Sequence, residues 1–483
     1  MDILLIDPPY IGLKGMPIDC GYHVGLTSLA AYLRDEGIET AVLMGDLLLD
    51  LPSGNKWLSS NLKKYAAGQR DYETIIDDKT HLVWGKMADR VRQAEPLAVG
   101  ISYLTPLKCV VARIASLVKE IDRDIKVIVG SFHPTACPEE VMRNTDIDFA
   151  VVGEGEIPLR RLVKELKKDR PKWANVPGIH YRDNEGQVQH NPAASLISDL
   201  DELPFPARDL VLNCDYNRYR VHSLATGRGC PYTCSFCADR KLWGGKVRRR
   251  SVANVIAELR LLKDTYKPNC IDITDGTFTY DREYLRTFCN TMIDHELKIK
   301  WRCTARYDNL DEGLLQLMKR ANCSGLYFGL ESGSDRLLKA VSKNLTVAKI
   351  REVSQMVHDS GIPSVTSVLL GLPDEGREDM AATLQLMKAI KTDIFDVNSY
   401  VPLPGTPLYE AMSEEDRKNL DWRKVAFKSL DNYFSKRMSY EDFRIYRAEA
   451  YQIANAVRRK TAVRFAVRMF FDSIGGLFRK LRR

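Results

Sequence analysis

The feature that most constrains this chain is a group of three cysteines on one short segment. Cys230, Cys234 and Cys237 stand in C-x3-C-x2-C spacing within residues 229–237. Three thiolates on one loop can bind three irons of a [4Fe–4S] cube, because sulfur ligands suit iron–sulfur clusters. No nearby cysteine supplies a fourth ligand, so one iron is left open to a small molecule. A zinc site is the alternative, but zinc usually takes four ligands with paired C-x2-C or C…H spacing.

Composition and charge limit the kinds of protein that this chain can be. The chain has 483 residues, too many for one core, and is 45% hydrophobic and 28% charged, as in ordinary globular proteins. The net charge is +7, and residues 458–483 contribute +8 of it. The other residues therefore carry a net charge of −1, which argues against a nucleic-acid partner. The 11 cysteines are scattered, and a thiolate-bound cluster needs a reducing compartment. With no signal peptide and no apolar run of about 18 residues, we expect a cytoplasmic protein.

The first part of the chain alternates short apolar strands with helices. This pattern predicts a doubly wound, Rossmann-like parallel sheet covered on both faces. Residues 47–95 fit the pattern poorly and are expected to be a mostly helical insertion. A turn at 184–186 predicts a hairpin over residues 180–189. The expected strands are residues 3–6, 40–44, 98–101, 126–129 and 149–152, and the expected helices are 25–36, 107–120 and 157–166.

A proline-rich stretch at residues 203–207 marks a linker, after which a second α/β series begins. Six βα units predict a partial (β/α)6 barrel of the TIM type, with its site at the carboxyl ends of the strands. Ser251 is expected to cap the first helix. The strands are expected at residues 223–226, 270–274, 298–303, 325–330, 364–370 and 394–401. The domains are expected at 1–195, 221–410 and 411–483, with a linker at 196–220 and a helical last region.

Segments at the expected strand ends, in order after the cysteines, resemble the radical S-adenosylmethionine (SAM) superfamily over about residues 220–410. The resemblance implies that SAM chelates the open iron and that strand-end side chains surround it. The basic run at residues 246–250 is expected to be a solvated loop. The matching segments are residues 272–278, 301–306, 331–334, 371–375 and 401–407, and the implied SAM contacts are Asp275, Arg306, Glu331, Ser332 and Glu375.

Segments of the first 170 residues resemble the cobalamin-binding domain that precedes the barrel in one large group of that superfamily. Glycines and small polar residues at strand ends would let a flat corrin ring approach the backbone. The D-x-H-x-x-G motif, whose histidine ligates cobalt in many cobalamin domains, is absent from this sequence. The matching segments are residues 7–9, 25–33, 100–103, 130–134 and 153–156, and the implied cobalamin contacts are Gly100, Ser102, Gly130, Ser131 and His133.

The two resemblances together imply a cobalamin-dependent radical SAM enzyme, most simply a methyltransferase. It would act on an unactivated carbon through a 5′-deoxyadenosyl radical and methylcobalamin, with an electron from a flavodoxin- or ferredoxin-like donor and with sensitivity to oxygen. A cyclisation or rearrangement of a tetrapyrrole or lipid, without methyl transfer, is the alternative. A tRNA methylthiotransferase is disfavoured because Cys20, Cys109 and Cys137 form no second triad.

The last segment of the chain combines bulky apolar residues with cations. From Arg458 to Arg483 it carries nine Lys or Arg residues and one acid, Asp472. Such a segment can be a helix on an anionic membrane surface, at the inner face of the membrane. It can equally be a helix docked on the barrel with a basic face toward solvent. The sequence leaves both interpretations open.

Overall fold

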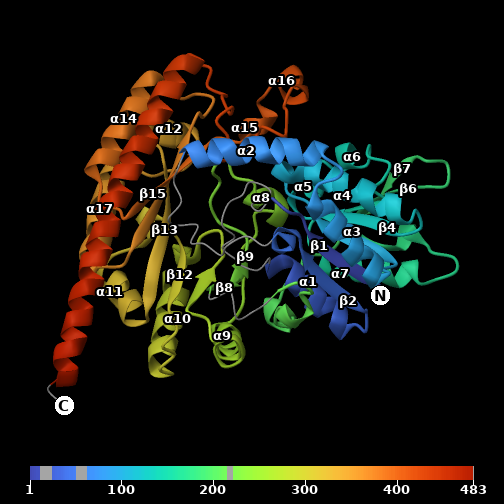
Figure 1. The fold of residues 1–483 in the computed structure, drawn as a ribbon, viewed down its shortest axis with the longest axis horizontal. Coiled ribbons are helices and arrows are strands. Elements are labelled where there is room, and N and C mark those ends of the chain that lie inside the picture. The colour runs from blue at the N-terminus through green and yellow to red at the C-terminus, as the bar shows by residue number, and fades with distance from the viewer. Residues whose placement is uncertain (11–23, 50–61, 215–220, 482–483) are drawn as a thin grey trace.

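The structure is a computed structural model that describes residues 1–10, 24–49, 62–214 and 221–481. Two α/β halves lie side by side, and one long helix runs along the outer edge of the second half (Figure 1). The predicted fold class, a doubly wound sheet followed by a partial barrel and a helical C-terminal region, is confirmed.

The first half is built on a seven-stranded sheet in the order β2-β1-β3-β4-β5-β6-β7. Its first five strands are parallel, and β6 and β7 add an antiparallel hairpin at the edge. All five predicted strands and the hairpin are confirmed. Strands β2 and β3 are buried along their whole length, which explains their continuous apolar sequences. The strands are β1 (Ile3–Asp7), β2 (Thr40–Met44), β3 (Ala98–Ser102), β4 (Lys126–Gly130), β5 (Phe149–Val151), β6 (Ile179–Arg182) and β7 (Val188–His190).

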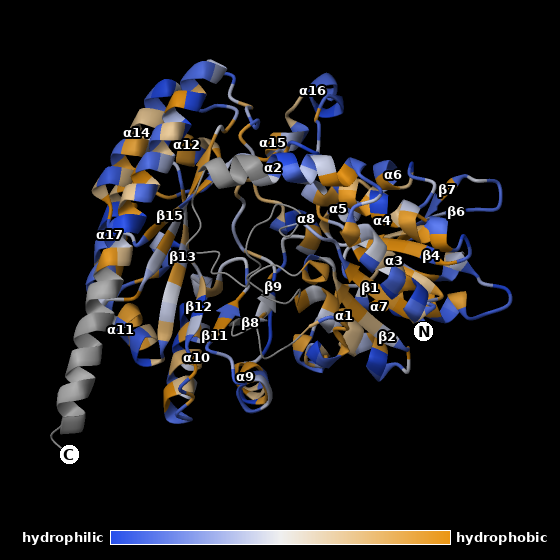
Figure 2. Cartoon of the chain, viewed as in Figure 1, coloured by the Kyte–Doolittle hydropathy of each residue, from blue (hydrophilic) through white to orange (hydrophobic). Residues whose placement is uncertain are grey.

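Helices cover both faces of this sheet. Apolar residues of α1 and α7 form one core cluster with the strands, and apolar residues of α3 and α4 form another on the opposite face. Figure 2 shows the strands as the most hydrophobic part of this half. The predicted insertion is helical where it is described, and residues 50–61 lie outside the described residues. The helices are α1 (Val24–Asp35), α2 (Leu62–Asp77), α3 (Leu82–Ala94), α4 (Lys108–Ile121), α5 (Phe132–Ala136), α6 (Pro138–Val141) and α7 (Glu156–Leu166).

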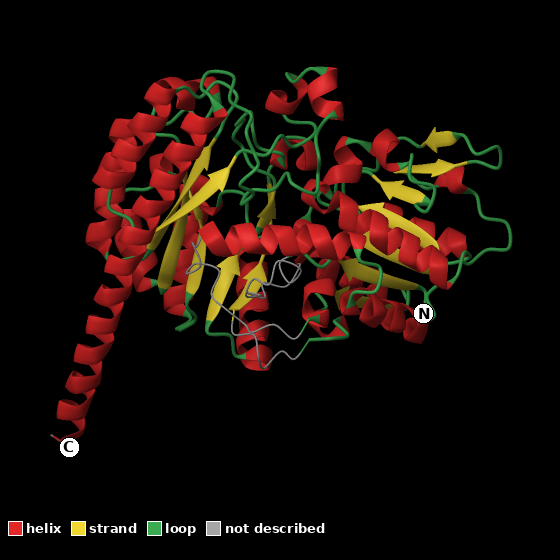
Figure 3. Cartoon of the chain, turned by 45° about the horizontal axis from the view of Figure 1, so that its top comes forward, coloured by secondary structure: helices red, strands yellow, loops and turns green. Residues whose placement is uncertain are grey.

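The second half is a partial barrel of six parallel strands in chain order. Figure 3 shows its strands with helices along their outer side. Helices pack on its outer face, and the Ser251 hydroxyl caps the first of them by accepting a hydrogen bond from the Asn254 amide, as predicted. The strands are β8 (Val221–Leu224), β11 (Cys270–Ile273), β12 (Trp301–Ala305), β13 (Cys323–Glu331), β14 (Ser364–Leu370) and β15 (Ile394–Ser399). The helices are α9 (Val252–Tyr266), α10 (Arg282–Asp294), α11 (Glu312–Arg320), α12 (Asp335–Ala340), α13 (Val347–Ser360) and α14 (Arg377–Ala389).

The region after the barrel holds α15 (Pro407–Glu410), α16 (Glu414–Lys418) and the long helix α17 (Tyr440–Leu481), separated by turns and loop. Ala450, Tyr451 and Ala454 of α17 are buried in the barrel core. The Thr461 hydroxyl donates to the Asp393 carbonyl over 2.8 Å. Helix α17 is therefore docked on the barrel up to Thr461, as one of the two interpretations of the sequence predicted. The structure does not describe the side chains after Val463. Within the described residues, no helix meets the length and hydropathy needed to cross a bilayer.

The connection between the halves, where it is described, packs on both of them. Its Leu212 amide donates to the Val42 carbonyl of β2 over 2.9 Å. Arg208 is buried and bonds the Glu258 carboxylate of α9 over 2.9 Å and the Ser223 carbonyl of β8 over 2.8 Å. Glu258 is fully buried, so the connection is joined to the barrel by an ion pair that water does not screen.

We predict that Arg208→Met lowers the free energy of unfolding by about 1.5–3 kcal/mol, because it removes one of the two arginines that pair with the buried Glu258 carboxylate, while Arg250 remains. Thermal and urea unfolding of the full chain measure the change. The matched control is Arg260→Met, which removes an exposed arginine from the same helix as Glu258 and should change stability by no more than about 0.5 kcal/mol. Equal stability of the two variants would contradict the assigned role of Arg208.

Candidate functional site

The three cysteines lie on one loop at the carboxyl end of the barrel strands. This cysteine loop, residues 229–238, connects β9 (Gly227–Arg228) to the short helix α8 (Asp239–Trp243). Cys230 and Cys234 are half-buried, Cys237 is exposed, and all three are free thiols. The barrel therefore presents three sulfur donors on a single loop.

Hydrogen bonds fasten the cysteine loop from two sides. The Ser235 amide donates to the Val341 carbonyl over 3.0 Å, and the Leu408 amide donates to the Ser235 carbonyl over 3.1 Å. Phe236 packs in a small apolar cluster that includes Tyr400. Val341 and the segment that contains Tyr400 and Leu408, two distant parts of the chain, therefore hold the loop in place.

The donor set fits a [4Fe–4S] cluster by its chemistry, since three free thiols on one loop are the ligands such a cluster takes. Throughout the described residues, which include the whole loop, no group of three or more His, Cys, Asp or Glu side chains is arranged to hold a metal ion. Burial raises the pKa of Cys234, and the charges of Lys343 and Arg306 oppose that rise.

Arg306 and Glu331 lie beside the cysteine loop and share Lys343 as a neighbour. The Arg306 guanidinium lies 3.7 Å from the ring centre of Tyr232 in the loop and donates to the Lys343 carbonyl over 2.8 Å. It also bonds both carboxylate oxygens of Asp308, over 3.0 and 2.9 Å. The Lys343 ammonium lies 2.9 Å from the Glu331 carboxylate. Two predicted SAM contacts therefore meet at one charged cluster, which also contains Lys343.

The backbone around this charged cluster is strained. Glu331, Ser342 and Asn344 have φ values of 63°, 54° and 53°, a region that residues other than glycine rarely adopt. Gly329 leaves the space for the pair, because a Cβ there would lie 2.8 Å from the Lys343 ammonium. Strain of this kind persists where the surrounding structure enforces it, commonly at binding and catalytic sites.

The other three predicted SAM contacts are engaged inside the protein. Asp275 is buried and accepts a hydrogen bond from the Thr226 amide over 2.7 Å. Ser332 is buried, with its hydroxyl 3.2 Å from the Thr383 hydroxyl. Glu375 accepts from the Gly371 amide over 2.5 Å, and burial raises its pKa to about 8. Their roles as SAM contacts stay predictions, and in this structure they brace the ends of the barrel strands.

A cavity of about 260 Å³ lies at the carboxyl edge of the first sheet, beside β1 and β3, where the strand order reverses. Ligands of open α/β sheets usually bind at such a reversal. Gly100, Ser102, Gly130 and Ser131 line the cavity, as their predicted role requires. Gly100 lets β3 pack closely against Leu5 of β1, since a Cβ on Gly100 would lie 2.7 Å from the Leu5 side chain.

The opposite wall of the cavity comes from the barrel half. Arg228, just before the cysteine loop, lines it together with Leu242 and Trp243 of α8, just after the loop. The Arg228 guanidinium lies 5.5 Å from the ring centre of Trp243. The segment that carries the three cysteines therefore also closes the cavity of the first half.

An ionic bridge holds these two walls together. Arg228 donates to the Glu154 carboxylate over 2.7 Å and also to Glu156, and both carboxylates follow β5 and are buried. Arg248 adds a second contact to Glu154, over 2.8 Å. Burial alone would raise the pKa of Glu154, but hydrogen bonds from Arg248 and the charge of Arg228 outweigh it and hold the pKa below its usual value.

The basic run at residues 246–250 is therefore not a solvated loop, and that prediction was wrong. Arg248 bonds Glu154, and Arg250 bonds Glu258 over 2.6 Å. Arg249 lies 4.3 Å from the ring centre of Tyr280 and 3.8 Å from the Asp275 carboxylate. Glu154 is 94 residues from Arg248 in sequence, so the local charge pattern alone could not reveal that pairing and indicated an exposed loop.

His133 does not line the cavity. It is buried, with its Nδ1 atom 3.1 Å from the Thr105 hydroxyl and its ring centre 4.5 Å from that of Tyr103. Its Nε2 atom has no hydrogen-bond partner among the described residues. Burial lowers the pKa of His133 to about 4, so the ring is neutral at physiological pH. A contact between His133 and cobalamin stays a prediction, and this geometry does not favour it.

Family models match both halves of the chain. A model of the radical SAM superfamily matches residues 224–387, and a model of the B12-binding domain matches residues 57–163. An uncharacterized methyltransferase of Pyrococcus horikoshii is 30% identical over 77% of this chain and 81% of its own. An anaerobic magnesium-protoporphyrin IX monomethyl ester cyclase of Rubrivivax gelatinosus is 26% identical over 75% of this chain and 66% of its own.

Among solved structures, the radical SAM methyltransferase TsrM from Kitasatospora setae has the same fold. It superimposes with a TM-score of 0.63 at 18% identity, covering 84% of this chain and 74% of its own. The chain therefore belongs to the radical SAM superfamily, in the group whose barrel follows a cobalamin-binding domain. It is a radical SAM enzyme of the family that uses a [4Fe–4S] cluster, SAM and cobalamin, as predicted from the sequence.

Several residues of this site were not predicted from the sequence. Lys343 stands in a polar loop with no motif around it, and Arg228 and Trp243 flank the cysteine motif without belonging to it. Glu154 and Glu156 were part of a matching segment, but only their pairing with Arg228 shows their purpose. The sequence feature that could have predicted these ion pairs was the presence of two acidic residues at one strand end and of a basic run elsewhere in the chain.

We predict that His133→Gln retains cobalamin binding and removes one source of acid sensitivity. The pKa of His133 is about 4 in the folded chain and about 6.5 when unfolded, so protons bind the unfolded state preferentially between these values. As pH falls from 6.5 to 4, the wild type should lose about 1.4 kcal/mol per pH unit relative to the variant. Unfolding titrations across this range and equilibrium binding of cobalamin are the measurements. Loss of cobalamin binding would show that His133 contacts the corrin.

Proposed function

We propose that this enzyme is a methyltransferase that transfers a methyl group to an unactivated carbon of a small-molecule or lipid substrate. The observation that supports it most is the shared wall: residues on both sides of the cysteine loop close the cavity of the cobalamin-binding half. A methyl donor in that cavity and a radical generated at the loop would then act on one substrate between them. Methyltransferase names among the relatives support the same reaction.

The cofactors would supply the radical and the methyl group, and the chain would supply position and shielding. Arg306 and Lys343 offer cationic donors beside the loop, suited to the carboxylate of SAM. Glu331 offers an acceptor held in place by Lys343. Trp243 and Leu242 give the cavity an apolar wall that keeps water away from a reactive centre.

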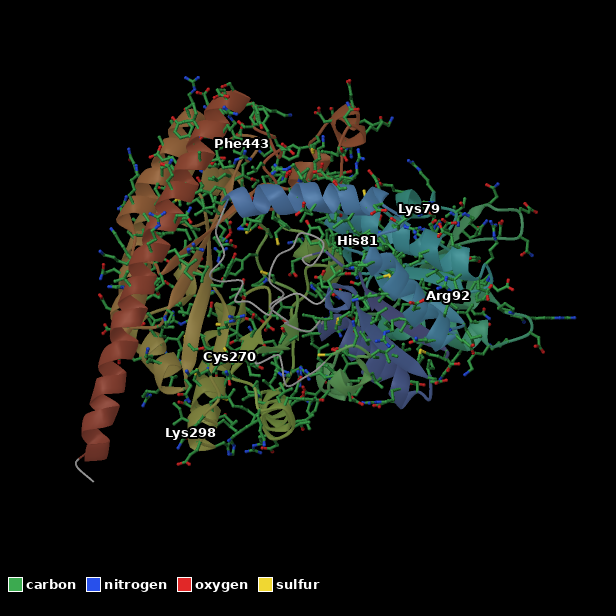
Figure 4. All side chains as sticks on the ribbon, in the orientation of Figure 1. Lys79, His81, Arg92, Cys270, Lys298 and Phe443 are labelled. Atoms are coloured by element: carbon green, nitrogen blue, oxygen red, sulfur yellow. The ribbon has the colours of Figure 1, made fainter. Side chains whose placement is uncertain are left out.

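The test uses the full chain, reconstituted without oxygen with iron, sulfide and cobalamin and supplied with methyl-labelled SAM and a reductant. We predict that label appears with the corrinoid or in a product, and that 5′-deoxyadenosine forms. Cys234→Ala should abolish 5′-deoxyadenosine formation. Cys270→Ala is the matched control, because Cys270 begins β11 at the far end of the barrel (Figure 4) and should leave the reaction intact.

The outcomes separate the two reaction classes. Formation of 5′-deoxyadenosine with no transfer of label would contradict methyl transfer and favour a cyclase or rearrangement of the kind named for the Rubrivivax relative. Absence of 5′-deoxyadenosine from the wild type would contradict radical chemistry altogether.

A further inference from the structure

A groove of about 540 Å³ lies between α13, α14 and α17, next to the residues that lead into β15. Its floor is apolar and includes the side chains of Met387, Ile390 and Val457. None of the residues that make the cobalamin cavity or the cysteine loop belongs to it. The groove is therefore separate from the site described above.

Exposed cations surround this apolar floor. Lys388, Lys391 and Lys460 line the groove and are exposed. Lys388 is paired with Glu449 over 2.8 Å, whereas neither Lys391 nor Lys460 forms an ion pair with any residue that the structure describes. The nearby Asp393 is buried and its carboxylate accepts a hydrogen bond from the Ser364 amide over 2.8 Å. The net charge at the groove is positive, which complements an anion.

Helix α17 passes this groove and then leaves the barrel. Val463, on the next turn, is 63% exposed, the largest exposed fraction among the exposed large apolar side chains of the described residues. The helix continues to Leu481 and projects past the barrel (Figure 1). In sequence, this projecting segment adds Arg464 and Arg468 among aromatic and aliphatic residues.

We propose that the groove and the projecting turns of α17 form a binding site for an anionic phospholipid at a membrane surface. The phosphate would pair with Lys391 and Lys460, and an acyl chain would lie along the apolar floor. Bulky apolar residues beside cations are the composition of helices that lie on anionic bilayers. Charge complementarity and the apolar floor together select this occupant over a neutral lipid.

The position of this lipid site separates it from catalysis. The groove lies at the amino end of β15, whereas the cysteine loop lies at the carboxyl ends of the barrel strands. A membrane bound there would hold the enzyme at the bilayer without presenting its lipids to the cysteine loop. The proposed contact would therefore localise the enzyme to the membrane, and it does not identify the substrate.

The test is co-sedimentation of the full chain with vesicles of phosphatidylglycerol and phosphatidylcholine, compared with vesicles of phosphatidylcholine alone. We expect binding to the anionic vesicles, weakened by salt. The double variant Lys391→Glu/Lys460→Glu should reduce partitioning on the order of tenfold or more. The matched control is Lys79→Glu/Lys172→Glu, which makes the same charge change at exposed lysines of the cobalamin-binding half and should bind as the wild type does.

Three results would overturn the proposal. One is absence of wild-type binding, or equal binding to both kinds of vesicle. Another is equal loss in the groove variant and the control variant, which would indicate a response to net charge alone. The third is loss of binding on removing residues 464–483 with no effect of the groove variant, which would exclude the groove as part of the site. Circular dichroism of each variant confirms that it is folded.

Discussion

The ionic bridge from Arg228 to Glu154 and Glu156 is the interaction on which the rest of the site depends. Removing charged groups from water is costly, and that cost is offset only when each charge meets a well-placed partner. Here two carboxylates at one strand end face two arginines, Arg228 of β9 and Arg248 of β10 (Arg248–Arg249), all at least mostly buried. Because Arg228 stands two residues before Cys230, the bridge fixes the cysteine loop relative to the cavity of the first half.

The fold was largely predictable, because short apolar runs between amphipathic helices leave few arrangements other than parallel sheets. Every expected strand of both halves exists in the described residues, with ends shifted by up to about three residues. The cysteine spacing and the strand-end glycines of the cavity were equally local signals. The helical expectation for residues 411–483 was too simple, since turns and loop separate α16 from α17.

Pairings between distant residues could not be predicted in the same way. Arg228 and Glu154 are 74 residues apart in sequence and meet only because β5 and β9 end at facing edges. The ion pair between Lys343 and Glu331 could not be predicted either. It forms because the backbone around it adopts a strained conformation and because Gly329 leaves room for the two side chains. His133 shows a different limit of sequence analysis. Its position after a strand predicted a contact with a cofactor, and the fold buries its ring against Tyr103 and Thr105. A strand end positions a residue near a site without deciding where its side chain points.

The central proposal is that one segment carries the cluster ligands and lines the cavity in which cobalamin would bind, so that a bound cluster and cobalt would lie close together. The most direct measurement is electron paramagnetic resonance of the reconstituted chain with a reduced cluster and cob(II)alamin present at once. We predict that the two paramagnets interact, so that the combined spectrum shows splitting or accelerated relaxation absent from each centre alone. A combined spectrum equal to the sum of the separate ones would contradict it.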